Sequence, residues 1–246
     1  MRLKDKVALV TGCRRGIGRA IAEALAAQGA HIIANDLAID DTSSMVTSIR
    51  DQGRRVFPVV ADITDKQAVT NMVAAALQAF ERIDILINNA GNYPAAPLLE
   101  IPEAQWDAVI DVNLKGTFLV TQTVVQQAML PQQHGRIVNI TSCDGKTPTV
   151  GITHYAAAKA GVISLTKSFA LELAPYGITA NAVAPGWVSS ETVLKGDRWK
   201  AVVKNIPCAR LADPSEIAHG VVFLVEERSA YINGEILDIN GGLIMD

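Results

Sequence analysis

Short apolar runs alternate with longer amphipathic segments along this chain of 246 residues. The short runs are rich in Val and Ile and predict strands, whereas apolar residues at helical spacing predict helices between them. The predicted strands cover residues 7–11, 31–36, 56–60, 84–88, 136–141, 178–183 and 235–239. The predicted helices cover residues 17–28, a polar segment that ends near 50, and residues 66–81, 103–129, 153–174 and 214–225.

The order of these elements predicts the α/β fold class. The strands are almost continuously apolar, as expected when helices cover both faces of a sheet. Strands that alternate with helices form a doubly wound parallel sheet, so we expect a Rossmann-type sheet of about seven strands. No linker or repeat interrupts the chain, and we expect residues 1–246 to form a single domain. Residues 1–92 would form its cofactor-binding half and 93–246 its catalytic half, with an irregular substrate loop at about 187–207.

Composition excludes several classes of partner. Lys and Arg total 22 against 25 Asp and Glu, and no basic stripe occurs, so we expect no nucleic acid. The apolar runs are shorter than the ~20 residues that span a bilayer, so we expect no membrane either. Residues 1–6 lack the apolar core of a signal peptide. The three cysteines lack both metal-ligand spacing and a disulfide framework, so we expect no metal site and a cytoplasmic location.

The first predicted strand runs into a glycine-rich loop with the sequence TGCRRGIG at residues 11–18. Glycines between a strand and a helix allow a tight turn and let backbone N–H groups approach a pyrophosphate. The spacing is G-x-x-x-G-x-G, which differs from the general dinucleotide fingerprint G-x-G-x-x-G. The loop predicts a dinucleotide site, although a simple turn is the alternative for such a loop taken alone.

The end of the second predicted strand bears on which dinucleotide is used. Asp36 stands there, where a carboxylate can accept hydrogen bonds from ribose hydroxyls and repel a 2′-phosphate. Arg14 and Arg15 favour the opposite choice, since guanidinium groups can pair with that phosphate. Asp36 would contact the ribose itself, so the sequence predicts NAD, with NADP as the alternative.

Further motifs follow in order along the chain. They are Asp62-Ile63-Thr64, Asn88-Asn89-Ala90-Gly91, Asn113, Ser142, Tyr155-Ala-Ala-Ala-Lys159 and Pro185-Gly186. Together with the glycine-rich loop, they make the chain resemble the short-chain dehydrogenase/reductase family over essentially its full length. The resemblance implies an NAD(P)-dependent oxidoreductase that interconverts a secondary alcohol and a ketone.

The resemblance assigns catalytic roles to four residues: Asn113, Ser142, Tyr155 and Lys159. Tyr155 would be the acid/base, with Lys159 on the same helical face because the two are four residues apart. A free Tyr has a pKa of ~10, so we expect the ammonium, helped by the positive charge of an oxidised nicotinamide, to lower the pKa of Tyr155. Ser142 would bind the substrate oxygen, and Asn113 would hold a water that links Lys159 to solvent.

The resemblance also implies which residues bind the cofactor. Except for Tyr155 and Lys159 on the predicted helix 153–174, they lie at or after the carboxyl ends of predicted strands. They are Gly12, Arg14, Arg15, Gly16, Ile17, Gly18, Asp36, Asp62, Ile63, Asn89, Ala90, Gly91, Tyr155, Lys159, Pro185, Gly186, Val188 and Ser190. Most relatives carry Thr where Ser190 stands, but the hydroxyl is retained.

The substrate is harder to predict than the reaction. Residues 206–245 most resemble β-ketoacyl-carrier-protein reductases, which makes NADPH-dependent 3-oxoacyl-[acyl-carrier-protein] reduction the alternative function. Those enzymes need basic residues to dock an acidic carrier protein, and the corresponding places hold Gln132, Gln133 and Leu171. This difference, together with Asp36, favours another substrate.

The expected substrate pocket is fairly polar. By family position it includes Tyr93, Asp144, His154 and Trp187, which favours a small polyol, sugar or hydroxy acid. Asp144 is equally explained as a turn residue before a glycine, and His154 as a structural or entrance residue. A cofactor-sensing regulator without turnover is a further alternative, disfavoured because all four catalytic residues are present. By family resemblance we expect a homotetramer built on the long helices.

Overall fold

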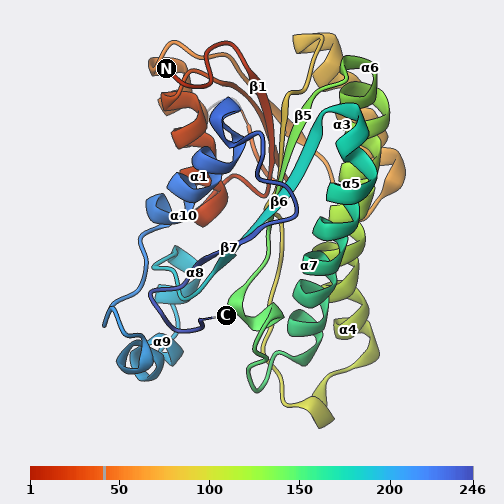
Figure 1. Ribbon diagram of the computed structural model, residues 1–246. Helices are drawn as coiled ribbons and strands as arrows, with labels where there is room; N and C mark the ends of the chain where they lie inside the picture. Colours follow the sequence, from red (N-terminus) through yellow and green to blue (C-terminus); the bar gives the residue numbers. More distant parts are fainter. Residues whose placement is uncertain (41–42, 246) are drawn as a thin grey trace.

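The computed structural model describes residues 1–40 and 43–245, and seven parallel strands form one sheet at its centre (Figure 1). The strands are β1 (Val7–Thr11), β2 (His31–Asp36), β3 (Val56–Val60), β4 (Ile85–Asn88), β5 (Gly135–Ile140), β6 (Ile178–Pro185) and β7 (Ile236–Ile239). Their order across the sheet is β3-β2-β1-β4-β5-β6-β7, and each neighbouring pair is parallel. The predicted doubly wound parallel sheet is confirmed.

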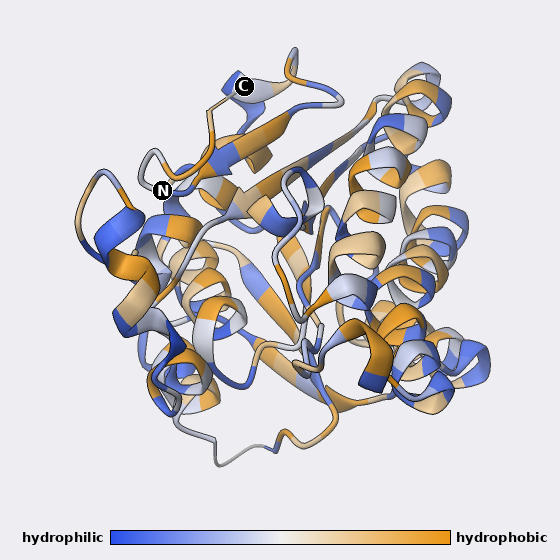
Figure 2. Ribbon diagram, turned by 90° about the horizontal axis from the view of Figure 1, so that it is seen from below, coloured by the Kyte–Doolittle hydropathy of each residue, from blue (hydrophilic) through white to orange (hydrophobic). Residues whose placement is uncertain are grey.

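Helices cover both faces of the sheet. They are α1 (Gly16–Ala27), α2 (Ser44–Asp51), α3 (Lys66–Phe80), α4 (Glu103–Ile110), α5 (Gly116–Val124), α6 (Leu130–Gln132), α7 (Thr153–Leu173), α8 (Glu191–Leu194), α9 (Arg198–Val202) and α10 (Pro214–Val225). α1 and α10 lie on one face, and α3, α5 and α7 lie on the other (Figure 1). Cover on both faces explains why the strands are largely apolar, and much of the sheet is orange in Figure 2.

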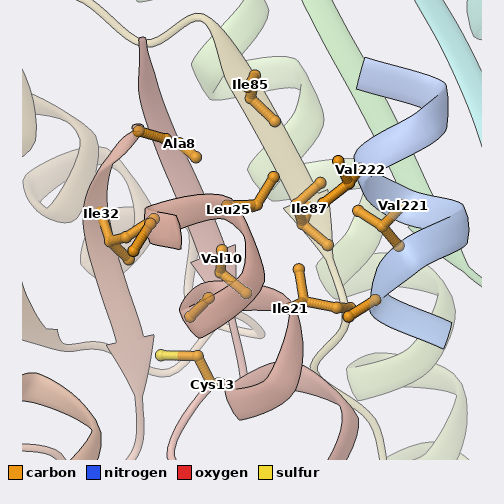
Figure 3. Packing of buried hydrophobic residues seen from close by; sticks show 14 of the residues in the cluster. Ala8, Val10, Cys13, Ile21, Leu25, Ile32, Ile85, Ile87, Val221 and Val222 are labelled. Carbon is orange, nitrogen blue, oxygen red and sulfur yellow. The ribbon is translucent and has the colours of Figure 1, made fainter. Parts of the chain in front are cut away.

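The two faces carry two hydrophobic cores, and successive residues of each strand alternate between them. On one side, Val10 and Ile87 pack with Ile21 of α1 and Val221 of α10 (Figure 3). On the other side, Leu9 and the residues around it pack against α3 and α5. The sheet is therefore held rigidly between two apolar layers, and its strand ends form a firm support for the loops that follow them.

The strand order reverses between β1 and β4. From β1 the chain adds β2 and β3 toward one edge of the sheet, and from β4 it adds β5, β6 and β7 toward the other. In open α/β sheets this switch point leaves a crevice at the carboxyl ends of the strands, where ligands bind. The loop after β1 and the loop after β4 lie side by side at this place, because Cβ atoms added to Gly12 would meet Ala90. The fold thus points to a ligand site at the motifs that follow β1, β4 and β5.

Two predicted segments differ from the structure. Residues 103–132 form one helical segment, but π-helical turns at Asp111–Lys115 and Val125–Met129 divide it into α4, α5 and α6. The segment 187–207, predicted to be irregular, contains α8 and α9. Within the described residues, no helix combines the length and the apolar character needed to cross a membrane.

Candidate active site

The glycine-rich loop is fastened to the loop after β4. The Thr11 hydroxyl accepts hydrogen bonds from the backbone N–H groups of Asn89 and Ala90, at 3.0 and 3.1 Å. The Asn89 side chain in turn donates to the carbonyls of Thr11 and Gly12, at 3.0 and 2.9 Å. A Cβ at Gly12, where φ is +63°, would lie 2.7 Å from Ala90 Cα. Only glycine allows this approach of the two backbones.

The start of α1 suits a diphosphate. Arg15 precedes the helix in an extended conformation, and its side chain makes no capping hydrogen bond. The first N–H groups of a helix have no partner within the helix and carry partial positive charge. Gly16 has a φ of +58°. A Cβ added to it would lie 3.5 Å from the Cβ of Ser190, at ordinary contact distance. These residues therefore fit the phosphate groups of a dinucleotide.

Asp36 and Arg14 interact directly. The Asp36 carboxylate accepts a hydrogen bond from the Arg14 backbone N–H at 3.1 Å, and the Arg14 guanidinium lies 3.9 Å from its other oxygen. Burial raises the pKa of Tyr93, and the Arg15 charge is among the effects that oppose this rise. The charge of Arg14, beside Asp36, is partly balanced by the carboxylate.

The predicted adenine-side residues are held by local structure. The Asp62 carboxylate accepts hydrogen bonds from the backbone and the hydroxyl of Thr64, at 2.9 and 2.8 Å. Ile63 is buried in the core beside α3 and α5, and a Cβ at Gly116 would meet its side chain. The Ile63 side chain therefore supports the loop from behind, and any contact it makes with a cofactor would be through its backbone.

Tyr155 and Lys159 share one face of α7, as their spacing predicts. Lys159 Nζ lies 5.6 Å from the centre of the Tyr155 ring and donates a hydrogen bond to the Ile140 carbonyl at 2.8 Å. Burial lowers the pKa of Lys159 to about 8. The lysine is therefore held in place by the end of β5, and a large fraction of it is unprotonated at moderately alkaline pH.

The expected lowering of the Tyr155 pKa is wrong for the protein's own groups. Burial raises the pKa of Tyr155, a hydrogen bond with Ser142 opposes the rise, and the charge of Asp144 adds to it. Desolvation disfavours the charged phenolate, and the hydrogen bond of the Lys159 ammonium goes to a backbone carbonyl. Additional positive charge would be required to bring this pKa toward neutrality.

Asn113 lies at the centre of the first π-helical turn and is fully buried. Its Nδ2 donates to the carbonyls of Asn92 and Val109, each at 2.9 Å. Among the described residues, nothing donates to its Oδ1. A Cβ at Gly91 would lie 2.6 Å from that Oδ1 and 3.7 Å from Lys159 Nζ. Asn113 and Lys159 thus border the same small space at Gly91, and an unsatisfied buried acceptor there fits the predicted water.

Ser142 follows β5 and forms a compact turn with Asp144. The Ser142 hydroxyl donates to Asp144 Oδ2 and accepts from the Asp144 backbone N–H, both at 3.1 Å. The Thr149 hydroxyl donates to Asp144 Oδ1 at 2.5 Å. Burial, with Asp144 next in effect, raises the pKa of the neighbouring Cys143 thiol to about 11, so Cys143 stays protonated and serves as a packed apolar residue.

The four predicted substrate residues have different surroundings. The Tyr93 ring is partly exposed and lies 5.6 Å from the Tyr155 ring, so it borders the same site. Asp144 contacts Ser142, as described. The His154 side chain is fully buried and contacts Gln105 of α4 at 3.0 Å. This position agrees with the structural role considered for His154 and gives no support to a contact with substrate.

Trp187 lies in the loop after β6. It borders a cavity of about 140 Å³ whose other lining residues are Cys208, Arg210, Ala212, Glu216, Ile239, Asn240 and Gly241. This cavity does not include Ser142 or Tyr155, so Trp187 has surroundings different from those of Tyr93. Its predicted contact with substrate gains no support from this position.

The remaining residues of that loop are fixed by neighbouring strands. The Gly186 N–H donates to the Ile239 carbonyl at 3.0 Å, and Val188 is buried and pairs with Ala212. The Ser190 hydroxyl caps α8 by accepting from the Val193 N–H at 3.4 Å. Hydrogen bonds with Ser190 and Thr192 also oppose the raised pKa of Tyr93, which places the Tyr93 phenol beside this loop.

Several contributors to the site were not predicted. The carbonyls of Ile140 and Asn92 position Lys159 and Asn113, but backbone carbonyls leave no mark in a sequence. The Thr149 hydroxyl holds Asp144 from a turn whose course the sequence pattern does not define. Thr11, by contrast, stands at the head of the glycine motif, and its position next to Gly12 could have identified it.

Comparison with known proteins agrees with this geometry. Residues 6–201 match the family described as short chain dehydrogenase. The chain is 41% identical to a 3-oxoacyl-[acyl-carrier-protein] reductase of Thermotoga maritima over the full length of both chains. It is 40% identical to a (2S)-[(R)-hydroxy(phenyl)methyl]succinyl-CoA dehydrogenase subunit of Thauera aromatica over 98% of both.

A solved structure is similar as well. The crystal structure of a putative short-chain alcohol dehydrogenase from Sinorhizobium meliloti superposes with a TM-score of 0.93 and 33% sequence identity, and covers 98% of this chain and 97% of that one. These relatives differ in the substrates that their names give, but they share the fold and the class of reaction. The chain belongs to the short-chain dehydrogenase family and is an oxidoreductase that acts on CH–OH groups with a nicotinamide cofactor.

Proposed function

We propose that the protein is an NAD-dependent dehydrogenase of small polar secondary alcohols, with Tyr155 as its acid/base. The observation that carries this proposal is the convergence of Tyr155, Ser142 and Lys159 at the carboxyl end of β5, beside Asn113 and its unsatisfied oxygen. When bound, the nicotinamide supplies the acceptor or donor of the hydride. The protein supplies position and handles the proton.

Each side chain has a part in handling that proton. Tyr155 takes the proton of the substrate hydroxyl in oxidation and returns it in reduction. Ser142 donates a hydrogen bond to the reacting oxygen, where negative charge develops. Lys159 and Asn113 hold a water at Gly91 through which the proton is exchanged with solvent. The positive charge that Tyr155 lacks in the protein alone is the reason for expecting Tyr155 to act as a base, in oxidation, only with the oxidised cofactor in place.

The preference for NAD rests on Asp36. Its carboxylate stands at the end of β2 beside the glycine-rich loop, where a ribose would lie. Arg14, which could otherwise pair with a 2′-phosphate, is approached by Asp36 to 3.9 Å and so has its charge partly balanced. This contact favours the unphosphorylated dinucleotide.

A second candidate function is 3-oxoacyl-[acyl-carrier-protein] reduction, which is favoured by the full-length similarity to the Thermotoga maritima enzyme. Two positions expected to dock an acidic carrier protein weigh against it. Gln132 is bound to the backbone of Ile83 by two hydrogen bonds, at 3.3 and 3.1 Å, and Leu171 is an exposed apolar residue. Neither offers a positive charge.

The deciding experiment compares NAD⁺ with NADP⁺ on a panel of polyols, secondary alcohols and hydroxy acids, and compares NADH with NADPH on a 3-oxoacyl thioester. We expect a higher kcat/KM with NAD⁺ and an alcohol. A higher kcat/KM with NADPH and the thioester would reverse the order of the two candidates. The Tyr155→Phe variant is the control for activity that does not arise from this site.

We also propose a homotetramer. Apolar side chains remain exposed on the helices of one face, namely Trp106 on α4, Phe118 on α5 and Leu171 on α7. Exposed apolar side chains of this kind can be covered in an interface between copies. Sedimentation of the full chain at micromolar concentration should give four times the chain mass, and the mass of a single chain would contradict the proposal.

A further inference from the structure

The Asp144 carboxylate is fixed beside the hydroxyl that binds the reacting oxygen. It lies in the turn Cys143–Gly145, with one oxygen bonded to Ser142 and the other to Thr149. The Asp144 backbone N–H donates back to the Ser142 oxygen at 3.1 Å. The carboxylate is half-buried and cannot turn away without losing two donors, so any substrate held by Ser142 must lie next to a negative charge.

The Ser142 hydroxyl proton has two competing acceptors, Asp144 and the substrate oxygen. A serine hydroxyl has one proton to donate, and in this structure it is donated to Asp144. The proposed reaction requires the same proton for the substrate oxygen. When substrate binds, Asp144 Oδ2 therefore loses a donor, and a partly buried carboxylate without its donor is costly. A substrate that brings a donor of its own to this oxygen removes the cost.

We propose that Asp144 accepts a hydrogen bond from a second hydroxyl of the substrate, on the carbon next to the reacting carbinol, and so selects vicinal diols and polyols. Two oxygens on adjacent carbons are separated by about one hydrogen-bond length, which is also the separation of Ser142 Oγ from Asp144 Oδ2. The inference rests on the proposed function and narrows its substrate class.

The same carboxylate disfavours two other classes of substrate. A 2-hydroxy acid would place a second negative charge next to Asp144, and like charges at such a distance repel strongly. A 3-oxoacyl thioester offers only carbonyl groups around its reacting carbon, and carbonyls accept hydrogen bonds but cannot donate them. Of the substrate classes considered for this fold, the vicinal diol alone supplies the missing donor.

The test uses three four-carbon probes with the same reacting group: butane-2,3-diol as all its stereoisomers, butan-2-ol and 2-hydroxybutanoate. Oxidation is followed with the preferred dinucleotide for the unchanged protein, for Asp144→Asn and for Thr149→Val. Asp51→Asn, an exposed residue at the end of α2, is the matched control for loss of one negative charge.

For the unchanged protein we expect kcat/KM for the diol to exceed that for butan-2-ol by on the order of 10- to 100-fold, with the hydroxy acid slowest. Asp144→Asn should remove most of the diol preference and raise the relative rate of the hydroxy acid. Thr149→Val, which keeps the charge, should still discriminate against the hydroxy acid. Calorimetric binding of the diol to Tyr155→Phe should weaken when Asp144→Asn is added, which tests the contact without turnover.

The possible failures are distinguishable. Turnover of these alcohols with ratios that are the same in Asp144→Asn and in Asp51→Asn would overturn the role of Asp144 and leave the proposed function intact. Absence of turnover for every alcohol with either dinucleotide would overturn the proposed function and the inference together. Equal binding of the diol by both Tyr155→Phe proteins would also overturn the inference.

Discussion

The Lys159 ammonium donates its hydrogen bond to the Ile140 carbonyl, 2.8 Å away, while its Nζ lies 5.6 Å from the centre of the Tyr155 ring. The end of β5 thus determines where the charge on α7 lies. Since the side chain is buried, a position set by a single backbone carbonyl keeps it at the Gly91 space that Asn113 also borders. The lysine charge therefore lies beside the Tyr155 ring, while its hydrogen bond goes to the backbone.

Replacement of Tyr155 by Phe should lower kcat/KM for alcohol oxidation by roughly 10²–10⁴-fold, because the group proposed to accept the proton is lost. The Phe ring retains the contact with Tyr93, so folding and dinucleotide binding should be preserved. Steady-state kinetics and a fluorescence titration with NADH test both halves. Retention of full activity would show that another residue is the acid/base.

The pH dependence of oxidation should respond to Asp144. Burial raises the pKa of Tyr155 and the Asp144 charge raises it further. Removing that charge in Asp144→Asn favours the phenolate, so the rise of kcat/KM with pH should begin at a lower pH than in the unchanged protein. Asp51→Asn should leave the profile where it is. A shift toward higher pH in Asp144→Asn would contradict this electrostatic account.

Replacement of Asp36 by Ala should lower the preference for NAD over NADP by about 10- to 100-fold, the value of hydrogen bonds to a charged group plus the loss of repulsion. Arg14 would then lack its carboxylate partner and could pair with a 2′-phosphate. The ratio of kcat/KM for the two dinucleotides measures the effect. An unchanged ratio would mean that Asp36 does not face the ribose.

Two glycines with left-handed backbone provide a matched test of the loop after β1. At Gly53, with φ +71°, an added Cβ meets nothing within 4 Å, so Gly53→Ala should cost only the left-handed strain of about 1–2 kcal/mol in the free energy of unfolding. Gly12→Ala carries the same strain and also overlaps Ala90, which should add about 1–3 kcal/mol.

Only the Gly12 variant should lose affinity for the dinucleotide, since Gly53 lies in the turn after α2. Urea denaturation and NADH titration distinguish the two effects. Equal losses of stability in both variants would show that the loop after β1 and the loop after β4 can move apart without an energetic cost.

The sheet was predictable because its strands are short, almost wholly apolar and separated by helices of clear periodicity. Predicted and observed strands differ by one or two residues at their ends, as at 178–183 against Ile178–Pro185. The helices at 191–202 could not be predicted, because segments of four or five residues show no apolar period. The π-helical turns could not be predicted either, because one additional residue in a turn barely changes the spacing of apolar residues along the helix.

The sequence predicted which residues come together at the site better than it predicted their burial and their contacts. Ser142, Tyr155 and Lys159 are brought together as the spacing implied. The direction of the Tyr155 pKa shift was predicted wrongly because it depends on burial, which a motif does not encode. His154, next to Tyr155, is turned into the interface with α4, since adjacent positions on a helix point about 100° apart.

The π-helical turn at Asp111–Lys115 also has a consequence for how this helical segment can vary. Because every residue inserted into a helix rotates all that follows by about 100°, the turn allows α4 to pack against α7 while α5 packs against α3. Deleting one residue from the turn would therefore do more than displace Asn113. It would rotate Val120 and Val124 of α5 away from the core they now fill. A deletion at the site would therefore also remove hydrophobic packing from that core.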